Sequence, residues 1–153
     1  MGLMVKRGNP LKIDSLERLL DPKVRFVNRD PDSGTRRLFD QLVEQRQLDQ
    51  TRINGYERIE FTHAAVAAYV ASGMADASFG VEAAARQFDL DFVRLVTEDY
   101  LFVSTKPILE RNSAVQRVLE IMRSEEFHQG IAELAGYATK DAGQVKTLRE
   151  AFR

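Results

Sequence analysis

Short strand-like segments alternate with segments of helical periodicity along the first hundred residues, and this alternation constrains the fold more than any other feature. Apolar or alternating runs typical of strands lie at residues 2–6, 24–28, 56–61, 77–79, 92–96 and 100–104. Helical spacing or helix caps separate most of them. Helices that connect neighbouring strands must cover the faces of the sheet those strands form, so the order favours parallel strands with right-handed crossovers. We therefore expect an α/β fold with a mostly parallel sheet and flanking helices.

The last third of the chain has a different pattern. Apolar residues recur at helical spacing in two stripes, formed by Val115, Val118, Leu119 and Met122 and then by Phe127, Ile131 and Leu134. The sequence thus predicts C-terminal helices.

Composition excludes several classes of function. The 22 basic and 23 acidic residues nearly cancel, so we expect this segment to make no direct contact with nucleic acid. The chain has no cysteine, and its two histidines, His63 and His128, lie far apart without acidic residues at metal-ligand spacing. We expect neither a metal nor a cofactor. The first residues lack a secretory signal and no segment reaches membrane-spanning length, so we expect a cytoplasmic protein without membrane contact.

The strongest functional signal is a buried strand that leads into a helix start at Ser33, Gly34 and Thr35, with Arg29 and Arg36 on either side. The first amides of a helix have no partner within it and attract anions. Gly34 lets a ligand approach the backbone, while hydroxyl and guanidinium groups add donors. The residues alone leave two interpretations open: an anion site, or a helix cap flanked by solvated arginines.

Thr62 and His63 form a second helix start. Capping by Thr62 is the favoured interpretation, and a ligand contact by either residue is the alternative. Glu57, Glu60 and Glu82 are acidic, but nothing in the sequence pairs them as an acid and a base. We therefore expect no catalytic residue and favour a protein that is not an enzyme.

Several motifs together resemble one family. The run Arg25-Phe-Val-Asn-Arg-Asp-Pro-Asp-Ser-Gly-Thr-Arg resembles the signature of the PBP-like domain, of the type II periplasmic-binding-protein superfamily, that occurs in molybdate-related transcriptional regulators and molybdopterin-biosynthesis proteins. Segments 55–57, 62–76, 79–85 and 90–100 resemble the same family in the same order. The resemblance spans about residues 2–143. It implies that Asn28, Arg29, Ser33 and Thr35 line an oxyanion pocket.

The resemblance also implies a domain organisation. The family normally has an α/β segment before the strand at 2–6, and here that segment is absent. We therefore expect residues 1–105 to form the second lobe, with hinge-crossing strands at 2–6 and 100–104. Residues 106–153 would be the C-terminal helical part of an incomplete first lobe. Because an uncovered sheet edge or helix face favours association, we expect a homo-oligomer or a missing N-terminal domain.

These observations lead to three hypotheses about function. The first is a regulatory, non-catalytic domain that binds a small oxyanion such as molybdate or tungstate, or a small anionic metabolite such as a pterin phosphate. The second is a domain of an enzyme of molybdenum-cofactor biosynthesis. The third is a truncated dimerisation module without a ligand.

Overall fold

The computed structural model describes residues 1–152, and the chain divides into two compact units, Met1–Glu98 and Asp99–Arg153. The elements of the first unit are β1 (Gly2–Val5), the 3₁₀ helix η1 (Leu16–Leu20), β2 (Phe26–Arg29), α1 (Gly34–Gln45), the 3₁₀ helix η2 (Gln50–Arg52), β3 (Ile59–Glu60), α2 (His63–Ala71), β4 (Ala77–Gly80), α3 (Glu82–Gln87) and β5 (Asp91–Arg94). Those of the second unit are α4 (Lys106–Arg111), α5 (Ser113–Arg123), α6 (Glu125–Ala132) and α7 (Leu148–Ala151).

The first unit is built on one five-stranded sheet with the order β3-β2-β4-β1-β5. Strand β2 pairs in parallel with β3 and β4, whereas β1 pairs in antiparallel fashion with β4 and β5. Strand β5 therefore runs in the same direction as β4, and β1 alone is reversed. The expected α/β fold with a mostly parallel sheet is confirmed.

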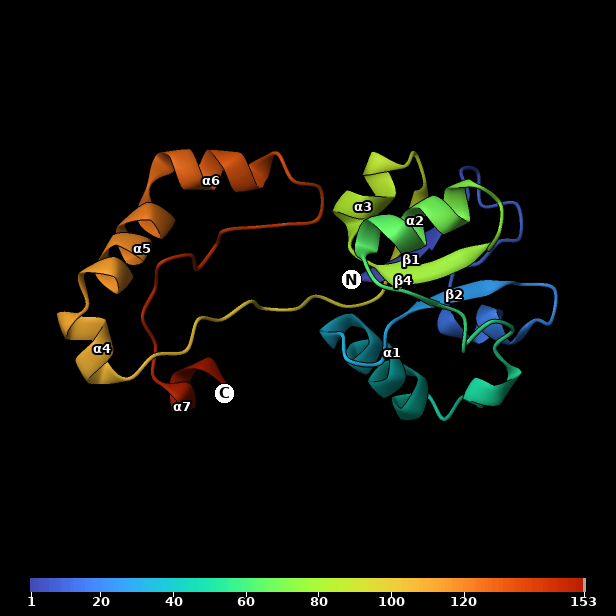
Figure 1. Cartoon of the computed structure of the whole chain (residues 1–153), viewed down its shortest axis with the longest axis horizontal. Helices are drawn as coiled ribbons and strands as arrows, with labels where there is room; N and C mark the ends of the chain where they lie inside the picture. The colour runs from blue at the N-terminus through green and yellow to red at the C-terminus, as the bar shows by residue number, and fades with distance from the viewer. Residues whose placement is uncertain (153) are drawn as a thin grey trace. The chain divides into compact units, whose positions relative to one another are not determined.

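Helices cover both faces of this sheet (Figure 1), α1 on one face and α2 and α3 on the other. Phe39 of α1 stacks on Phe26 of β2 at a ring-centroid distance of 4.9 Å and contacts Phe79 of β4 at 5.5 Å. On the opposite face Val66 and Val70 of α2 are fully buried. Since burying such side chains stabilises a fold by roughly 1.5–3 kcal/mol each, these two layers hold α1 and α2 on opposite faces of the sheet.

Two of the expected strands differ in the structure. Only Ile59 and Glu60 of the predicted strand 56–61 lie in β3, because Gly55, at φ +97°, turns the chain and Tyr56 enters the core, 7% exposed. Residues 100–104, predicted as a second hinge-crossing strand, form no strand, and Phe102 is 83% exposed. An apolar run becomes a strand only where a neighbouring strand pairs with it.

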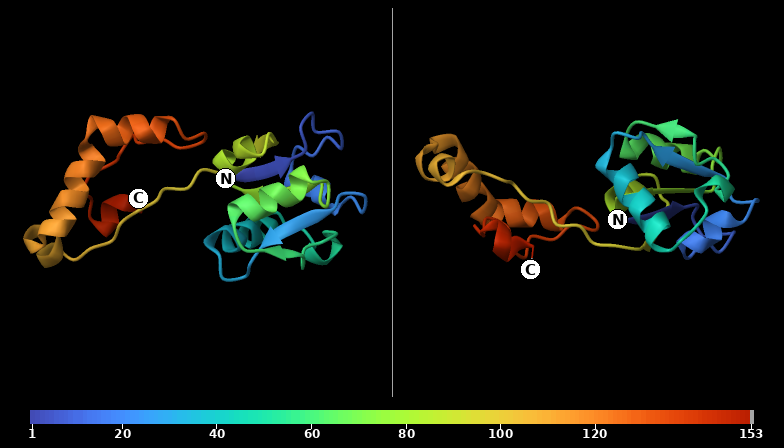
Figure 2. Two further views of the ribbon diagram at one scale, coloured as in Figure 1. Left: turned by 45° about the horizontal axis from the view of Figure 1, so that its top comes forward. Right: turned by 90° about the horizontal axis from the view of Figure 1, so that it is seen from below.

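The second unit contains the predicted C-terminal helices (Figure 2). The first predicted apolar stripe lies on α5, and Phe127 and Ile131 of the second lie on α6, whereas Leu134 follows the end of that helix. The loop after α6 returns to these helices, where Arg123 Nε donates to the Gly143 carbonyl at 2.9 Å and Thr139 Oγ1 lies 3.0 Å from His128 Nδ1. The unit begins at Asp99, whereas the sequence placed the boundary after residue 105. Its assignment to an incomplete first lobe stays a prediction, and residue 153 of that range lies outside the described residues.

Candidate functional site

The predicted site residues lie where β2 and β3 end and α1 and α2 begin. Because these strands are parallel, their carboxyl ends share one edge of the sheet. Helix α1 starts on one face of that edge and α2 on the other (Figure 1). Ligands of open α/β sheets bind at the carboxyl ends of the strands. This edge is therefore the candidate site.

The start of α1 presents unpaired amides. Ser33 is the cap, since its Oγ accepts from the Arg36 amide at 3.1 Å and donates to the Asp30 carbonyl at 2.9 Å. Its hydroxyl proton is thus already used within the loop. Within residues 1–152, no protein group accepts a hydrogen bond from the amides of Gly34 and Thr35. A methyl group added to Gly34 would meet nothing within 4 Å, so the space beside this residue is open.

The start of α2 lies beside them. Thr62 caps α2 by accepting from the Ala65 amide at 3.0 Å, as the favoured interpretation of its sequence predicted. The next residue, His63, has its Nε2 3.4 Å from Thr35 Oγ1, so the two helix starts touch across the sheet edge. His63 Nδ1 is buried without a hydrogen-bond partner. Burial, with a smaller contribution from the charge of Arg29, lowers the pKa of His63 to about 4, so the imidazole is neutral at pH 7.

Arg29, the last residue of β2, places a guanidinium at the same edge. Its side chain is 11% exposed. Nη2 donates to the Phe61 carbonyl at 3.0 Å and lies 3.4 Å from the Asp30 carboxylate, whereas Nε is buried without a partner. A buried donor without a partner costs free energy, and an anion that accepted from it would remove that cost.

Asn28 and Arg36 serve the scaffold through contacts within the protein. Asn28 is 2% exposed. Its side-chain Nδ2 donates to the Tyr56 carbonyl at 3.2 Å, and its Oδ1 accepts from the backbone amide of Arg29 at 3.0 Å. Arg36 Nε bonds both carboxylate oxygens of Asp40, and its guanidinium carbon lies 4.2 Å above the centre of the Tyr56 ring. Tyr56 closes the cluster by donating to Asp40 at 2.6 Å. The cluster fixes α1 against β2.

Sequence reasoning did not identify Asp40 or Tyr56. The spacing of Arg36 and Asp40, four residues apart on one helix face, signals an ion pair. No local signal brings Tyr56 to them, because it comes from a turn 16 residues beyond Asp40.

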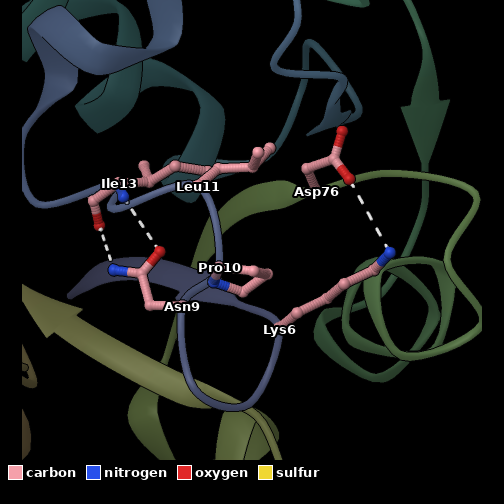
Figure 3. Close-up of a pocket in the computed structure, with 6 residues that line it drawn as sticks. All are labelled: Lys6, Asn9, Pro10, Leu11, Ile13 and Asp76. Carbon is pink, nitrogen blue, oxygen red and sulfur yellow. Dashed lines mark hydrogen bonds and ion pairs between the residues drawn. The ribbon is translucent and has the colours of Figure 1, made fainter.

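Two hollows lie at the opposite edge, where the parallel strands begin. The first, of about 10 Å³, has room for one water molecule beside the ion pair of Lys6 and Asp76 at 3.7 Å (Figure 3). The second, an open depression of about 670 Å³, is lined by residues between Gln50 and Arg58. Neither includes any of the eight residues predicted from the sequence.

No group of three or more acidic or histidine side chains within residues 1–152 is arranged to hold a metal ion. Over the same residues, no helix has both the length and the apolar character to cross a membrane.

Comparison with known proteins identifies the family of this chain. Residues 1–123 match the family described as the PBP superfamily domain. The chain belongs to this family. Two relatives cover most of the chain. The PBP-superfamily chain is 35% identical over 145 residues to the uncharacterized protein YvgK of Bacillus subtilis, an alignment that covers 94% of this chain and 46% of YvgK. It is 34% identical over 112 residues to an uncharacterized protein from the 5' region of a 2Fe-2S ferredoxin gene of Clostridium pasteurianum, covering 72% of this chain and 97% of the relative.

The PBP-superfamily chain thus spans about half the length of YvgK. Among solved structures, the ancestral amino acid-binding protein AncCDT-1, a precursor of cyclohexadienyl dehydratase, is similar with a TM-score of 0.40 and 21% identity, covering 61% of this chain and 38% of that one.

Proposed function

We propose that this PBP-superfamily domain is a non-catalytic binding domain for a small anion, held between the starts of α1 and α2. The observation that carries the proposal is a set of donors at one edge of the sheet: the unpaired amides of Gly34 and Thr35 and the unpaired, buried Nε of Arg29. His63 lies beside them, with its Nε2 3.4 Å from Thr35 Oγ1. Each helix start contributes a partial positive charge, and Arg29 contributes a full one. Such a set of donors attracts negative charge.

The roles of the residues follow from their contacts. The amides of Gly34 and Thr35 and the Thr35 hydroxyl would donate to the ligand, with His63 and Arg29 beside them. Ser33 and Thr62 would hold the two helix starts as caps. Asn28 and Arg36 would act indirectly through the cluster that fixes α1. The proposed site thus keeps every residue named from the sequence but divides them into contacting and supporting groups.

The class of ligand follows from the charge and the hydrogen-bond donors of the site. The carboxylate of Asp30 already pairs with Arg29 and that of Asp40 with Arg36, so the remaining donors favour an acceptor-only anion. Molybdate and tungstate fit this description, and so does a small anionic metabolite. The edge is open, so a facing surface would have to complete the pocket, from a second copy of the chain or from another protein segment. Ligand binding that drew the two surfaces together would suit a regulatory sensor.

The proposal is tested by titrating molybdate, tungstate and sulfate into the protein, with thermal unfolding and calorimetry as readouts. A ligand at a hundredfold its Kd adds about 2.7 kcal/mol of stability. Arg29→Gln should weaken binding about 10- to 100-fold, since a hydrogen bond to a charged group contributes roughly 1.5–3 kcal/mol. Thr35→Val, which removes one neutral donor, should weaken it about fivefold.

Arg52→Gln is the matched control, because this exposed arginine lies at the opposite edge and its loss changes the net charge equally. Equal weakening by the Arg52 and Arg29 substitutions would show that only overall charge matters. If none of these anions binds, the proposal is overturned.

A further inference from the structure

His63, the first residue of α2, has one ring nitrogen toward the start of α1 and the other toward the protein interior. Its Nε2 faces Thr35 at 3.4 Å, on the open side. Its Nδ1 is buried and faces the sheet, since a methyl group added to Gly80 of β4 would lie 3.1 Å from it and 2.8 Å from the side chain of Met4. Gly80 has no side chain, the thioether sulfur of Met4 is only a weak acceptor, and Nδ1 has no hydrogen-bond partner. A proton on Nδ1 therefore has no acceptor within the protein.

The charges around His63 oppose a second proton on the ring. From β2 it faces the Arg29 guanidinium, and from α1 the uncharged Thr35. Asp30, the nearest carboxylate in sequence to this strand end, is paired with Arg29. Glu82, at the start of α3, is held by arginines of α3 and β5 at 3.0 and 2.9 Å. Glu60, which ends β3 opposite Arg29, is not among the charges that act on His63, so no carboxylate of residues 1–152 serves as a counterion for the imidazolium.

We infer that anion binding at this site is coupled to protonation of His63, so that a doubly charged anion entering between α1 and α2 draws one proton onto the imidazole. The inference rests on the proposed function, because it needs an anion at this place. The bound anion would be the counterion that the protein does not provide. It would accept from Nε2 while offsetting the repulsion from Arg29. A dianion should therefore gain more from this coupling than a monoanion.

The size of the coupling follows from the two protonation states. Burial and the charge of Arg29 lower the pKa of His63 to about 4 in the ligand-free protein. An opposite charge within hydrogen-bonding range raises a pKa by roughly 1–3 units, so the bound state would titrate near pH 6. Linkage then predicts that affinity rises about fourfold from about pH 7.5 to about pH 5.5, with uptake of about 0.7 proton per anion bound at the lower value.

The experiment is calorimetric titration of sodium molybdate and sodium sulfate into the protein, in pairs of buffers that differ in ionisation enthalpy. Neither anion takes up a proton between about pH 6 and 8, so any proton uptake belongs to the protein. A difference in apparent enthalpy between buffers near pH 6, together with tighter binding at the lower pH, is the expected result. His63→Gln should abolish both effects, whereas His128→Gln, which changes the histidine in the second unit, should keep them.

A second measurement protects the test against a misfolded variant. The imidazole resonances of the wild-type protein, assigned with the same two variants, should show the pKa of His63 rising when molybdate is added. Binding without proton uptake, or with uptake that survives His63→Gln, would overturn the coupling and leave the proposed site intact. Failure of both anions to bind at any pH would overturn the proposed function together with the coupling.

Discussion

Acidification should destabilise the ligand-free protein through His63. The imidazole is partly buried at the start of α2, beside Arg29 and without a partner at Nδ1, and these surroundings lower its pKa from 6.5 to about 4. The unfolded chain therefore binds a proton at a higher pH than the folded chain does. Stability due to the neutral imidazole is complete above pH 6.5 and is lost as the pH falls from 6.5 toward 4.

The magnitude follows from linkage. A histidine with these two pKa values would remove about 2 kcal/mol of stability between about pH 7.5 and about pH 5. Because the ring is only partly shielded from water, solvent screening reduces this to about 1 kcal/mol. Urea unfolding at the two pH values, followed by circular dichroism, has the precision to measure such a change.

The comparison that isolates His63 is between variants. His63→Gln should lose about 1 kcal/mol less than the wild type on acidification, since other titrating groups are unchanged. His128→Gln should show how much a histidine elsewhere contributes. If His63→Gln and the wild type lost stability equally, the imidazole would not be held neutral by the fold, and the reasoning about its surroundings would be refuted.

Two further predictions concern the scaffold. Gly55→Ala should lose at least about 2 kcal/mol in urea unfolding, because φ is +97° and a methyl group would collide with the first carbonyl of β2, whereas Gly34→Ala should change stability by less than about 0.5 kcal/mol. Equal costs would contradict this. Asp76→Asn should lose about 1–2 kcal/mol because the carboxylate accepts three hydrogen bonds from Arg25, and Asp89→Asn, in an exposed ion pair, should lose less than about 0.5 kcal/mol. A cost at Asp89 as large as that at Asp76 would show that burial does not decide the difference.

Features that depend on local chemistry could be predicted from the sequence. The sequence predicts α2 over residues 63–71, as observed, because Thr62 caps it and Gly73, at φ +82°, follows its end. The strand–turn–helix at Ser33 was equally visible. Alternation of strands and helices was sufficient for the fold class.

Features that depend on distant partners could not be predicted. Tyr56 appeared to belong to a strand, but it joins the polar cluster of Arg36 and Asp40 because the turn at Gly55 directs it inward. Residues 100–104 have the composition of a strand yet lack a neighbouring strand. The reversed direction of β1 follows from its pairing with β4 and β5, which no local pattern specifies. The unpaired Nε of Arg29 and Nδ1 of His63 were likewise visible only in three dimensions.

The measurement that tests the anion site most directly is a titration of molybdate into ¹⁵N-labelled protein, followed by amide chemical shifts. We predict saturable shifts concentrated at the first two amides of each helix, which are those of Gly34 and Thr35 in α1 and of His63 and Ala64 in α2. Shifts concentrated instead around the depression between Gln50 and Arg58, or no saturable shifts at all, would contradict it.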